Sequence, residues 1–210
     1  MKKLGFLLFL LFLGSCSVIE QNHETPFFSP DFEKKALEEE FQLIDADRLE
    51  SFSELRNQIG QLACEGKVSG LKFTYLHKRY YVTAVAACPQ PTSTACHFQR
   101  IQIYVKNDSV IEPHSVDEGK PLAQLAAVLS EYISKPYFLQ TKENIMEPAL
   151  IHLYVEEEND MEVTKKALAT IAEDFAQLNS GKAKDFFAHS ILLARHDPTN
   201  FPPPPPPAKN

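Results

Sequence analysis

Apolar residues recur every three or four positions along four stretches of the chain, and this spacing gathers side chains on one face of a helix. Before the first stretch, Ser29 is a suitable N-cap and Pro30 a suitable first helical residue. After the last, Asn179, Ser180 and Gly181 supply a stop signal. The pattern therefore predicts four amphipathic helices, over residues 30–44, 51–64, 121–133 and 160–178.

Alternation of apolar and polar residues, which is typical of half-buried strands, marks the regions between these helices. It is clearest at residues 101–106, and Asn107 with Asp108 then fits a two-residue hairpin turn. Strands are expected at residues 71–75, 80–87, 98–106, 110–111, 149–155 and 190–195. Residues 66–112 are most simply an antiparallel meander. The predicted fold class is α+β: amino-terminal helices and an antiparallel meander, followed by a small αβ module with two helices packed on a mixed sheet.

Residues 1–16 have a pattern of their own. Two lysines at positions 2 and 3 precede an apolar run that is about half the ~20 residues needed to cross a bilayer. The run ends at Leu13-Gly14-Ser15-Cys16. A positive start, a short apolar core and small residues at the end are typical of a secretory signal. The last four residues resemble the cleavage and lipidation motif of bacterial lipoproteins.

The resemblance to lipoproteins implies that residues 1–15 are a signal peptide and that Cys16 is lipidated. The sulfur of Cys16 would carry a diacylglycerol, and its amino group a further acyl chain such as palmitate. Two or three acyl chains anchor a protein stably where one is marginal. In enteric bacteria, an aspartate directly after the lipidated cysteine resembles a signal for retention in the inner membrane. Ser17 occupies this position instead, so we expect an outer-membrane anchor facing the periplasm. Residues 16–29 are interpreted as a lipidated leash.

Composition narrows the classes of partner. The 210-residue chain has a formal net charge of −7, and removal of residues 1–15 would also remove two lysines. Nucleic-acid binding depends on clustered Lys and Arg, so no nucleic-acid partner is expected. Six consecutive prolines at 202–207 predict an extended polyproline tail over residues 199–210. The tail is interpreted as a stiff spacer or, alternatively, as a docking segment.

Three cysteines besides Cys16 would lie in an oxidising compartment, where disulfides persist. Cys88 and Cys96 enclose a turn-rich loop between two strand-like runs, so we expect a Cys88–Cys96 disulfide and a buried thiol at Cys64. A bridge from Cys64 to either of the other two is the alternative that the sequence leaves open. A zinc site at Cys88, Cys96 and His97 is less favoured, because structural zinc sites use four well-spaced ligands.

The order of elements from residue 98 to residue 198 is a hairpin, a helix, a strand, a second helix and a last strand. Within it, residues 101–108, 122–129, 149–151 and 192–198 carry the more specific pattern. Together they resemble the periplasmic domain of the ExbD/TolR family of biopolymer-transport proteins. The transmembrane helix and membrane-embedded aspartate of that family have no counterpart here, so energy transduction is not implied. The resemblance implies an αβ module that binds other envelope proteins or the cell wall.

The sequence offers few candidates for chemistry, and neither a metal nor a cofactor is expected. Ser69-Gly70-Leu71-Lys72 has the Ser-x-x-Lys spacing of penicillin-interacting serine enzymes, although it spans a glycine and the start of a strand. His152 is interpreted as a core or semi-exposed histidine, and His189 and His196 are not expected to share a face. The acidic run at 156–160 is interpreted as helix capping rather than calcium binding.

These patterns predict a non-catalytic outer-membrane lipoprotein that is a structural or accessory subunit of an envelope transport or secretion assembly. Its expected partners are membrane lipid, through Cys16, and other envelope proteins. A periplasmic module that binds a ligand or peptidoglycan is one alternative, and a serine hydrolase using Ser69 and Lys72 is another. The expected domains are the signal peptide 1–15, the leash 16–29, a helix pair with a β-hairpin region 30–97, the ExbD/TolR-like module 98–198 and the tail 199–210.

Overall fold

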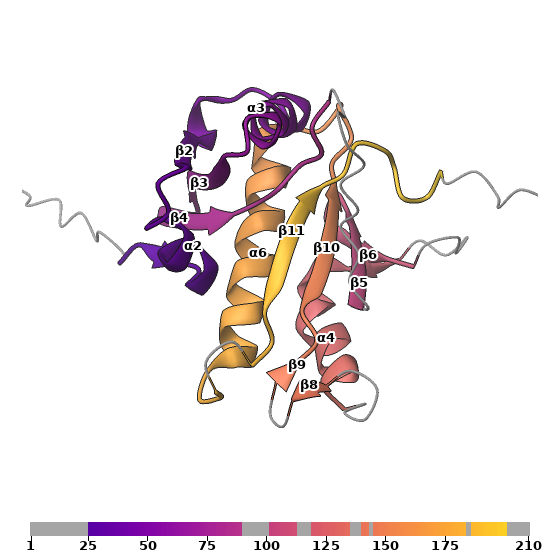
Figure 1. Cartoon of the computed structure of the whole chain (residues 1–210). Coiled ribbons are helices and arrows are strands. Elements are labelled where there is room, and N and C mark those ends of the chain that lie inside the picture. The colour runs from indigo at the N-terminus through magenta and orange to yellow at the C-terminus, as the bar shows by residue number, and fades with distance from the viewer. Residues whose placement is uncertain are drawn as a thin grey trace, which may run out of the picture.

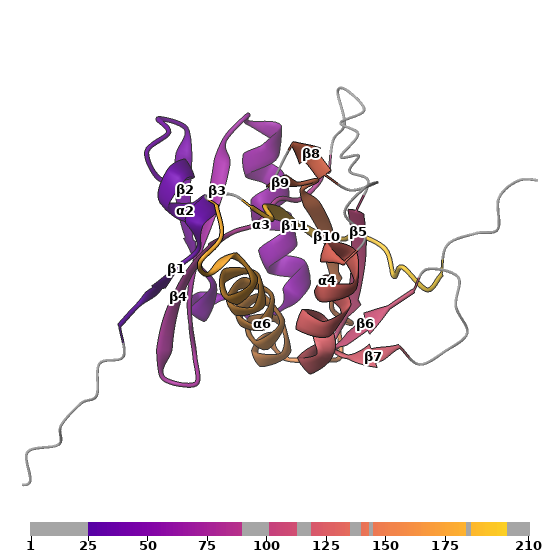
Figure 2. The same ribbon diagram turned by 90° about the horizontal axis from the view of Figure 1, so that it is seen from below.

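Figures 1 and 2 show a computed structural model of the protein, which describes residues 25–89, 101–112, 119–134, 140–142, 145–183 and 186–200. A four-stranded and a five-stranded sheet lie on either side of a long helix, α6 (Met161–Asn179). Both sheets contain parallel and antiparallel strand pairs. The predicted α+β fold class is therefore confirmed.

The four-stranded sheet is called the first sheet below. Its strand order is β1 (Phe27–Phe28), β4 (Lys78–Thr83), β3 (Val68–Tyr75) and β2 (Phe41–Asp45). β3 and β4 form an antiparallel hairpin, and β1 and β2 join its two sides in parallel. Leu76 and His77 form the hairpin turn with φ angles of 47° and 65°, as primed two-residue turns require. Helix α3 (Phe52–Cys64) connects β2 to β3 where a helix was predicted over residues 51–64, and Ser51 is its N-cap.

The helix predicted over residues 30–44 is wrong in its second half. Helix α2 spans only Pro30–Lys35, with Ser29 as its N-cap, and residues 41–45 form strand β2. The rings of Phe32 and Phe41 meet edge to face with centroids 5.4 Å apart, and both lie over Gly70 of β3. A Cβ at Gly70 would come within 2.8 Å of the Phe32 ring. The glycine of the neighbouring strand therefore makes room for β2, and this packing overrides the local helical pattern.

The five-stranded sheet, the second sheet, has the order β11 (His189–Leu193), β10 (Ala149–Tyr154), β5 (Ile101–Lys106), β6 (Ser109–Ile111) and β7 (Lys120–Pro121). β5, β10 and β11 are parallel, and β5 turns into β6 at Asn107, whose φ is 55°. Between β7 and β10 lie the 3-10 turn η2 (Leu122–Gln124) and helix α4 (Leu125–Ile133). The predicted hairpin, helix, strand, helix and strand occur in the expected order within the described residues, but β7 and the short strands at 140–142 and 145–146 were not predicted.

The antiparallel meander predicted over residues 66–112 is wrong, because the β3–β4 and β5–β6 hairpins belong to different sheets. Beyond β4 the chain reaches the edge of the second sheet. There the Val85 N–H donates to the Ile191 carbonyl oxygen, and the Leu193 N–H donates to the Val85 carbonyl oxygen, both at 2.8 Å. The segment after β4 therefore joins the two sheets instead of extending the first one.

Helix α6 lies at the centre of the core, and its apolar side chains belong to one buried cluster that draws on both sheets. Polar contacts also fasten α6 to the first sheet. Glu173 accepts hydrogen bonds from Lys78 Nζ at 2.6 Å and from the Tyr80 hydroxyl at 2.8 Å. Lys165 Nζ lies 2.9 Å from Asp47 Oδ1 in the 3-10 turn η1 (Ala46–Arg48). The small sheet of β8 (Gln140–Lys142) and β9 (Ile145–Met146) completes the described elements.

The disulfide joins Cys64 to Cys88, so the predicted Cys88–Cys96 pair is wrong and an alternative pairing is observed. Cys64 ends α3, and Gly60 lies one turn earlier on the same side of that helix. A Cβ at Gly60 would lie 2.9 Å from the Ala87 carbonyl oxygen and 3.3 Å from Pro89 Cδ. Gly60 therefore lets residues 87–89 run directly against α3, which brings Cys88 to Cys64.

Candidate functional site

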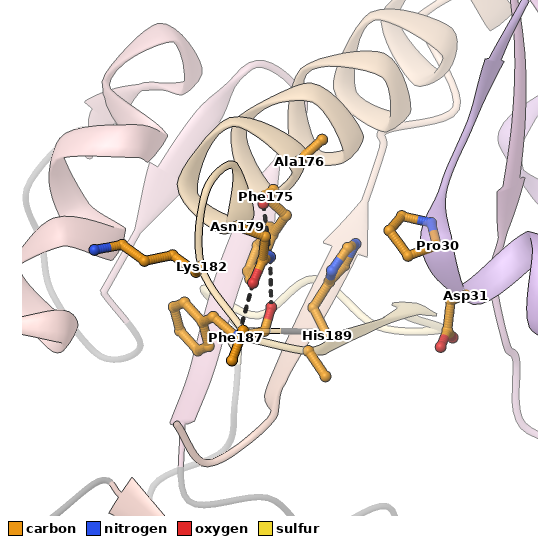
Figure 3. Close-up of a pocket in the computed structure, with 10 residues that line it drawn as sticks. Pro30, Asp31, Phe175, Ala176, Asn179, Lys182, Phe187 and His189 are labelled. Atoms are coloured by element: carbon orange, nitrogen blue, oxygen red, sulfur yellow. Dashed lines mark hydrogen bonds between the residues drawn. The ribbon is translucent and has the colours of Figure 1, made fainter. Parts of the chain in front are cut away.

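A cavity of about 200 Å³ lies where the end of α6, the start of β11 and the start of α2 come together (Figure 3). Its apolar lining comprises Pro30, Phe175, Ala176, Ala183, Phe187 and Ala188, and its polar members are Asp31, Asn179, Lys182 and His189. These residues come from segments that are far apart in the sequence. The cavity is therefore created by the tertiary fold and not by a local motif.

Asn179, the last residue of α6, holds one wall of this cavity in place. Its Nδ2 donates to the carbonyl oxygens of Phe175 at 2.7 Å and Phe187 at 3.0 Å. Its Oδ1 accepts the Phe187 N–H at 2.8 Å. The side chain thus ties the segment before β11 back onto the helix, as the dashed lines of Figure 3 show. The carbonyl groups of Phe175 and Phe187 and the Phe187 N–H thereby gain hydrogen-bond partners. Water could not easily replace these partners, because the groups are partly buried.

His189, the first residue of β11, places its imidazole ring against the ring of Phe175. The two ring centroids are 4.0 Å apart and the ring planes are inclined by 23°. Burial lowers the pKa of His189 to about 4, and the charge of Asp31 offsets only part of this effect. At neutral pH the imidazole is therefore uncharged, with one nitrogen as a donor and the other as an acceptor.

The charged residues of the cavity are Asp31 and Lys182. Asp31 Oδ2 accepts from the Thr83 hydroxyl at 3.3 Å and lies 3.7 Å from Lys35 Nζ. Lys182 Nζ lies 5.7 Å from the centroid of the Phe186 ring. The cavity volume is below the ~300–1,000 Å³ of sites for drug-sized ligands. Its chemistry suits a small, mainly apolar molecule with one polar group that hydrogen-bonds to a neutral imidazole.

A second polar cluster lies beyond the carboxyl ends of β5, β10 and β11, where open αβ sheets commonly bind ligands. Lys106 Nζ is 2.7 Å from Asp197 Oδ2 and 2.8 Å from Glu156 Oε1. Asn107 Nδ2 donates to Glu156 Oε2 at 2.8 Å, and the Thr199 N–H donates to Asp197 Oδ1 at 2.8 Å.

Lys106 sets the charge state of this cluster. Its hydrogen bond lowers the pKa of Glu156. Burial would raise the pKa of Asp197, but hydrogen bonds from Lys106 and Thr199 outweigh burial and lower it. The two carboxylates in turn raise the pKa of Lys106. Because both carboxylates are ion-paired with the same lysine, we interpret the cluster as a structural contact that holds the strand ends together.

Ser69 and Lys72 are not brought together by the fold. They lie three residues apart on β3, so their side chains point to opposite faces of the first sheet. The buried Ser69 hydroxyl donates to the Ala84 carbonyl oxygen at 2.6 Å. Lys72 Nζ lies 3.0 Å from Asp45 Oδ2. Each side chain therefore stabilises the sheet, and the lysine is not placed to act as a base for the serine.

The structure also places the candidate histidines and the acidic run at 156–160. His152 on β10 stacks on Tyr104 of β5 with ring centroids 4.5 Å apart. His189 lines the cavity, whereas His196 is exposed beyond β11, so the expected separation of these two is confirmed. Asp160 accepts the N–H groups of the first turn of α6, which confirms the capping interpretation.

Several predicted features lie outside the described residues, namely Cys16, Cys96, His97 and the prolines at 202–207. Within the described ranges, no group of three or more His, Cys, Asp and Glu side chains is positioned to hold a metal ion. Among the helices of those same ranges, none has the length and apolar character to span a bilayer.

Comparison of the chain with protein-family models, with curated proteins and with solved structures finds no match. The resemblances to lipoproteins and to the ExbD/TolR family therefore stay predictions.

Sequence reasoning missed the cavity and the Lys106 cluster as sites. The sequence identifies Asn179 only as part of a helix stop signal. No sequence pattern indicates that its side-chain amide also forms hydrogen bonds with the Phe187 backbone. The lysine cluster had a weak signal, because Lys106, Glu156 and Asp197 each follow or end a predicted strand. Parallel strands bring their carboxyl ends to one edge, but the strand order was needed to see that these three residues meet.

Proposed function

We propose that the protein is a lipoprotein of the bacterial outer membrane, anchored through Cys16, whose folded body is a structural or accessory subunit of an envelope assembly. The observation that carries this proposal is the Cys64–Cys88 disulfide. Structural disulfides are typical of proteins that fold in an oxidising compartment such as the periplasm. The disulfide thus supports the destination that residues 1–16 predict.

Polar groups that could have served a chemical reaction are bonded to other groups of the folded body, and this supports a structural role. Ser69, the serine of the only Ser-x-x-Lys candidate we identified, is committed to a backbone carbonyl. Lys106 forms ion pairs with both Glu156 and Asp197 at the strand ends. Groups that are engaged in this way hold elements together, as expected of a body that presents surfaces to other proteins.

Incorporation of an alkyne analogue of palmitate tests the anchor directly. The protein produced in a diderm bacterium should incorporate the label, and the Cys16→Ala variant should not. Cys96→Ala is the matched control, because it removes another cysteine and should leave labelling intact. Equal labelling of the wild type and Cys16→Ala would contradict an anchor at Cys16.

Cross-linking in intact cells tests the subunit role. After cross-linking and gentle detergent extraction, the protein should migrate in species larger than the monomer. In a control without cross-linker, extracted with a denaturing detergent, these larger species should be absent. Recovery of a monomer alone, from cells that carry the protein at its natural level, would contradict a place in an assembly.

A periplasmic ligand-binding module is the second candidate function, and the cavity at His189 favours it. Titration with phenol, indole and benzoate, followed through the NMR signals of His189, Phe175 and Phe187, tests binding at this place. Saturable shifts that are abolished by His189→Gln would support the candidate. The related possibility of peptidoglycan binding is tested by sedimentation with purified cell-wall sacculi, and a protein that stays in the supernatant would count against it.

A further inference from the structure

The edges of the two sheets differ in how they are protected. An unprotected edge strand offers backbone N–H and C=O groups to another chain, and proteins shorten, cover or interrupt such edges. In the described part, β1 and β7 have two residues each, and β7 ends in Pro121. The edge strand β11 is covered by two hydrogen bonds with Val85. Strand β2, with five residues, is the edge that lacks these protections.

The register shows which groups of β2 are open. The Val68 N–H donates to the Glu40 carbonyl oxygen at 3.0 Å, and Phe41 is opposite Val68 in the parallel pair. Alternate residues of a strand direct their backbone groups to the same side. Gln42 and Ile44 therefore pair with β3, while the N–H and C=O of Leu43 point away from the sheet. No described residue donates to or accepts from these two groups of Leu43.

Side chains beside this edge combine apolar surface with negative charge. Leu43 is 45% exposed, and Leu37 in the preceding turn is 87% exposed. Glu38, Glu39 and Glu40 follow Leu37 and are all exposed. The described lysines and arginines form no ion pair within 4.0 Å with these three glutamates.

We propose that the β2 edge, defined as residues 37–45, docks an extended basic segment of another protein by β-strand addition. The backbone of Leu43 would provide the main-chain hydrogen bonds, and the Leu43 side chain an apolar contact. The three glutamates would attract lysine or arginine side chains of the added strand, whereas they would repel a second copy of the same acidic edge. This surface is formed by the folded body alone, so the proposal stands independently of lipidation at Cys16.

Peptide titration of the detergent-solubilised full chain tests the proposal. The probe is the capped peptide Lys-Val-Lys-Leu-Lys-Val-Lys, and its matched control has the same sequence with alternate backbone nitrogens methylated. Methylation keeps the charge and the side chains but removes the N–H donors of one peptide edge. We expect the unmodified peptide to bind at least tenfold more tightly, with slowed amide exchange at Leu43. Equal affinity of the two peptides, or no binding at about 1 mM peptide, would overturn the proposal.

A pair of matched variants locates the site. Leu43→Lys should weaken peptide binding at least tenfold, because it places a positive charge against the lysines of the probe. Leu76→Lys changes an exposed leucine at the tip of the β3–β4 hairpin, 74% exposed, and should leave affinity within twofold. Far-UV circular dichroism confirms that both variants fold. Unchanged binding by Leu43→Lys, or a wild-type dimer that Leu43→Lys dissociates, would contradict docking of a basic partner at this edge.

Discussion

At the scale of single residues, His189 couples the stability of the body to pH. The folded protein keeps its imidazole neutral down to about pH 4, whereas an unfolded chain protonates it near pH 6.5. Unfolding therefore takes up a proton between these values, and stability falls as the pH decreases through this range. The loss attributable to His189 approaches about 3 kcal/mol at 1.36 kcal/mol per pKa unit.

Urea unfolding between pH 4 and pH 7 measures this coupling. The difference in unfolding free energy between the wild type and His189→Gln should change with pH in the window below pH 6.5. The control His196→Gln alters an exposed histidine and should follow the wild-type profile. Parallel profiles for the wild type and His189→Gln would show that the folded state does not hold this imidazole neutral.

Asn179 is the second residue whose role can be isolated. Asn179→Ala leaves the Phe187 N–H and the Phe187 carbonyl without their partners, which should cost about 1–3 kcal/mol of unfolding free energy. Gln177→Ala, at an exposed position of the same helical turn, should change stability by less than about 0.5 kcal/mol. Chemical denaturation compares the three proteins, and equal stability of both variants would contradict the anchoring role of Asn179.

At the scale of elements, the disulfide stabilises the contact between α3 and the segment after β4. The bridge closes a loop with a sequence separation of 24 residues, so its removal should cost about 3 kcal/mol on the chain-entropy estimate. Cys64→Ser should lower the unfolding free energy by roughly this amount, while Cys96→Ser should not. A non-reducing peptide map should link the peptides of Cys64 and Cys88. A Cys88–Cys96 linkage would contradict the observed pairing.

The strand ends of the second sheet are held by Lys106. Lys106→Met would leave Glu156 and Asp197 facing each other without a cation, and should destabilise the body by about 1–3 kcal/mol at pH 7. Both carboxyl groups have lowered pKa values, so their contribution is present above the pKa of the unfolded state and fades as the pH falls. The wild type and variant should therefore converge below about pH 4. A stability gap that is the same at pH 7 and pH 3 would contradict this account.

Comparison of particular elements shows what local sequence determines here. Helices α3 and α6 were predicted closely, because each has an N-cap side chain, Ser51 or Asp160, and a long apolar stripe. Strand β2 was missed because it is seated by Gly70, which is distant in sequence. The disulfide was mispaired for a similar reason, since Gly60 shapes the contact between α3 and residues 87–89. The local sequence pattern thus predicts helices and strands. Which of them pack together depends here on Gly60 and Gly70, where the absence of a side chain allows close approach of another segment.

At the scale of the whole molecule, the two sheets lie on either side of α6 (Figure 2). One buried cluster contains apolar side chains from α6 and from both sheets. This body has a disulfide and an open sheet edge, and residues 1–16 predict a lipid anchor. These features are the basis of the proposal that the protein is held at a membrane and presents its folded body to partners in the periplasm.

Intact-mass analysis of the protein extracted from bacterial membranes tests this central claim most directly. The account predicts a chain that begins at Cys16 and carries a diacylglycerol and an amide-linked acyl chain. The mass should also be lower by two hydrogens than that of the reduced form, as expected for one disulfide. A chain that begins at Met1, with an unmodified Cys16 and free thiols at Cys64 and Cys88, would contradict it.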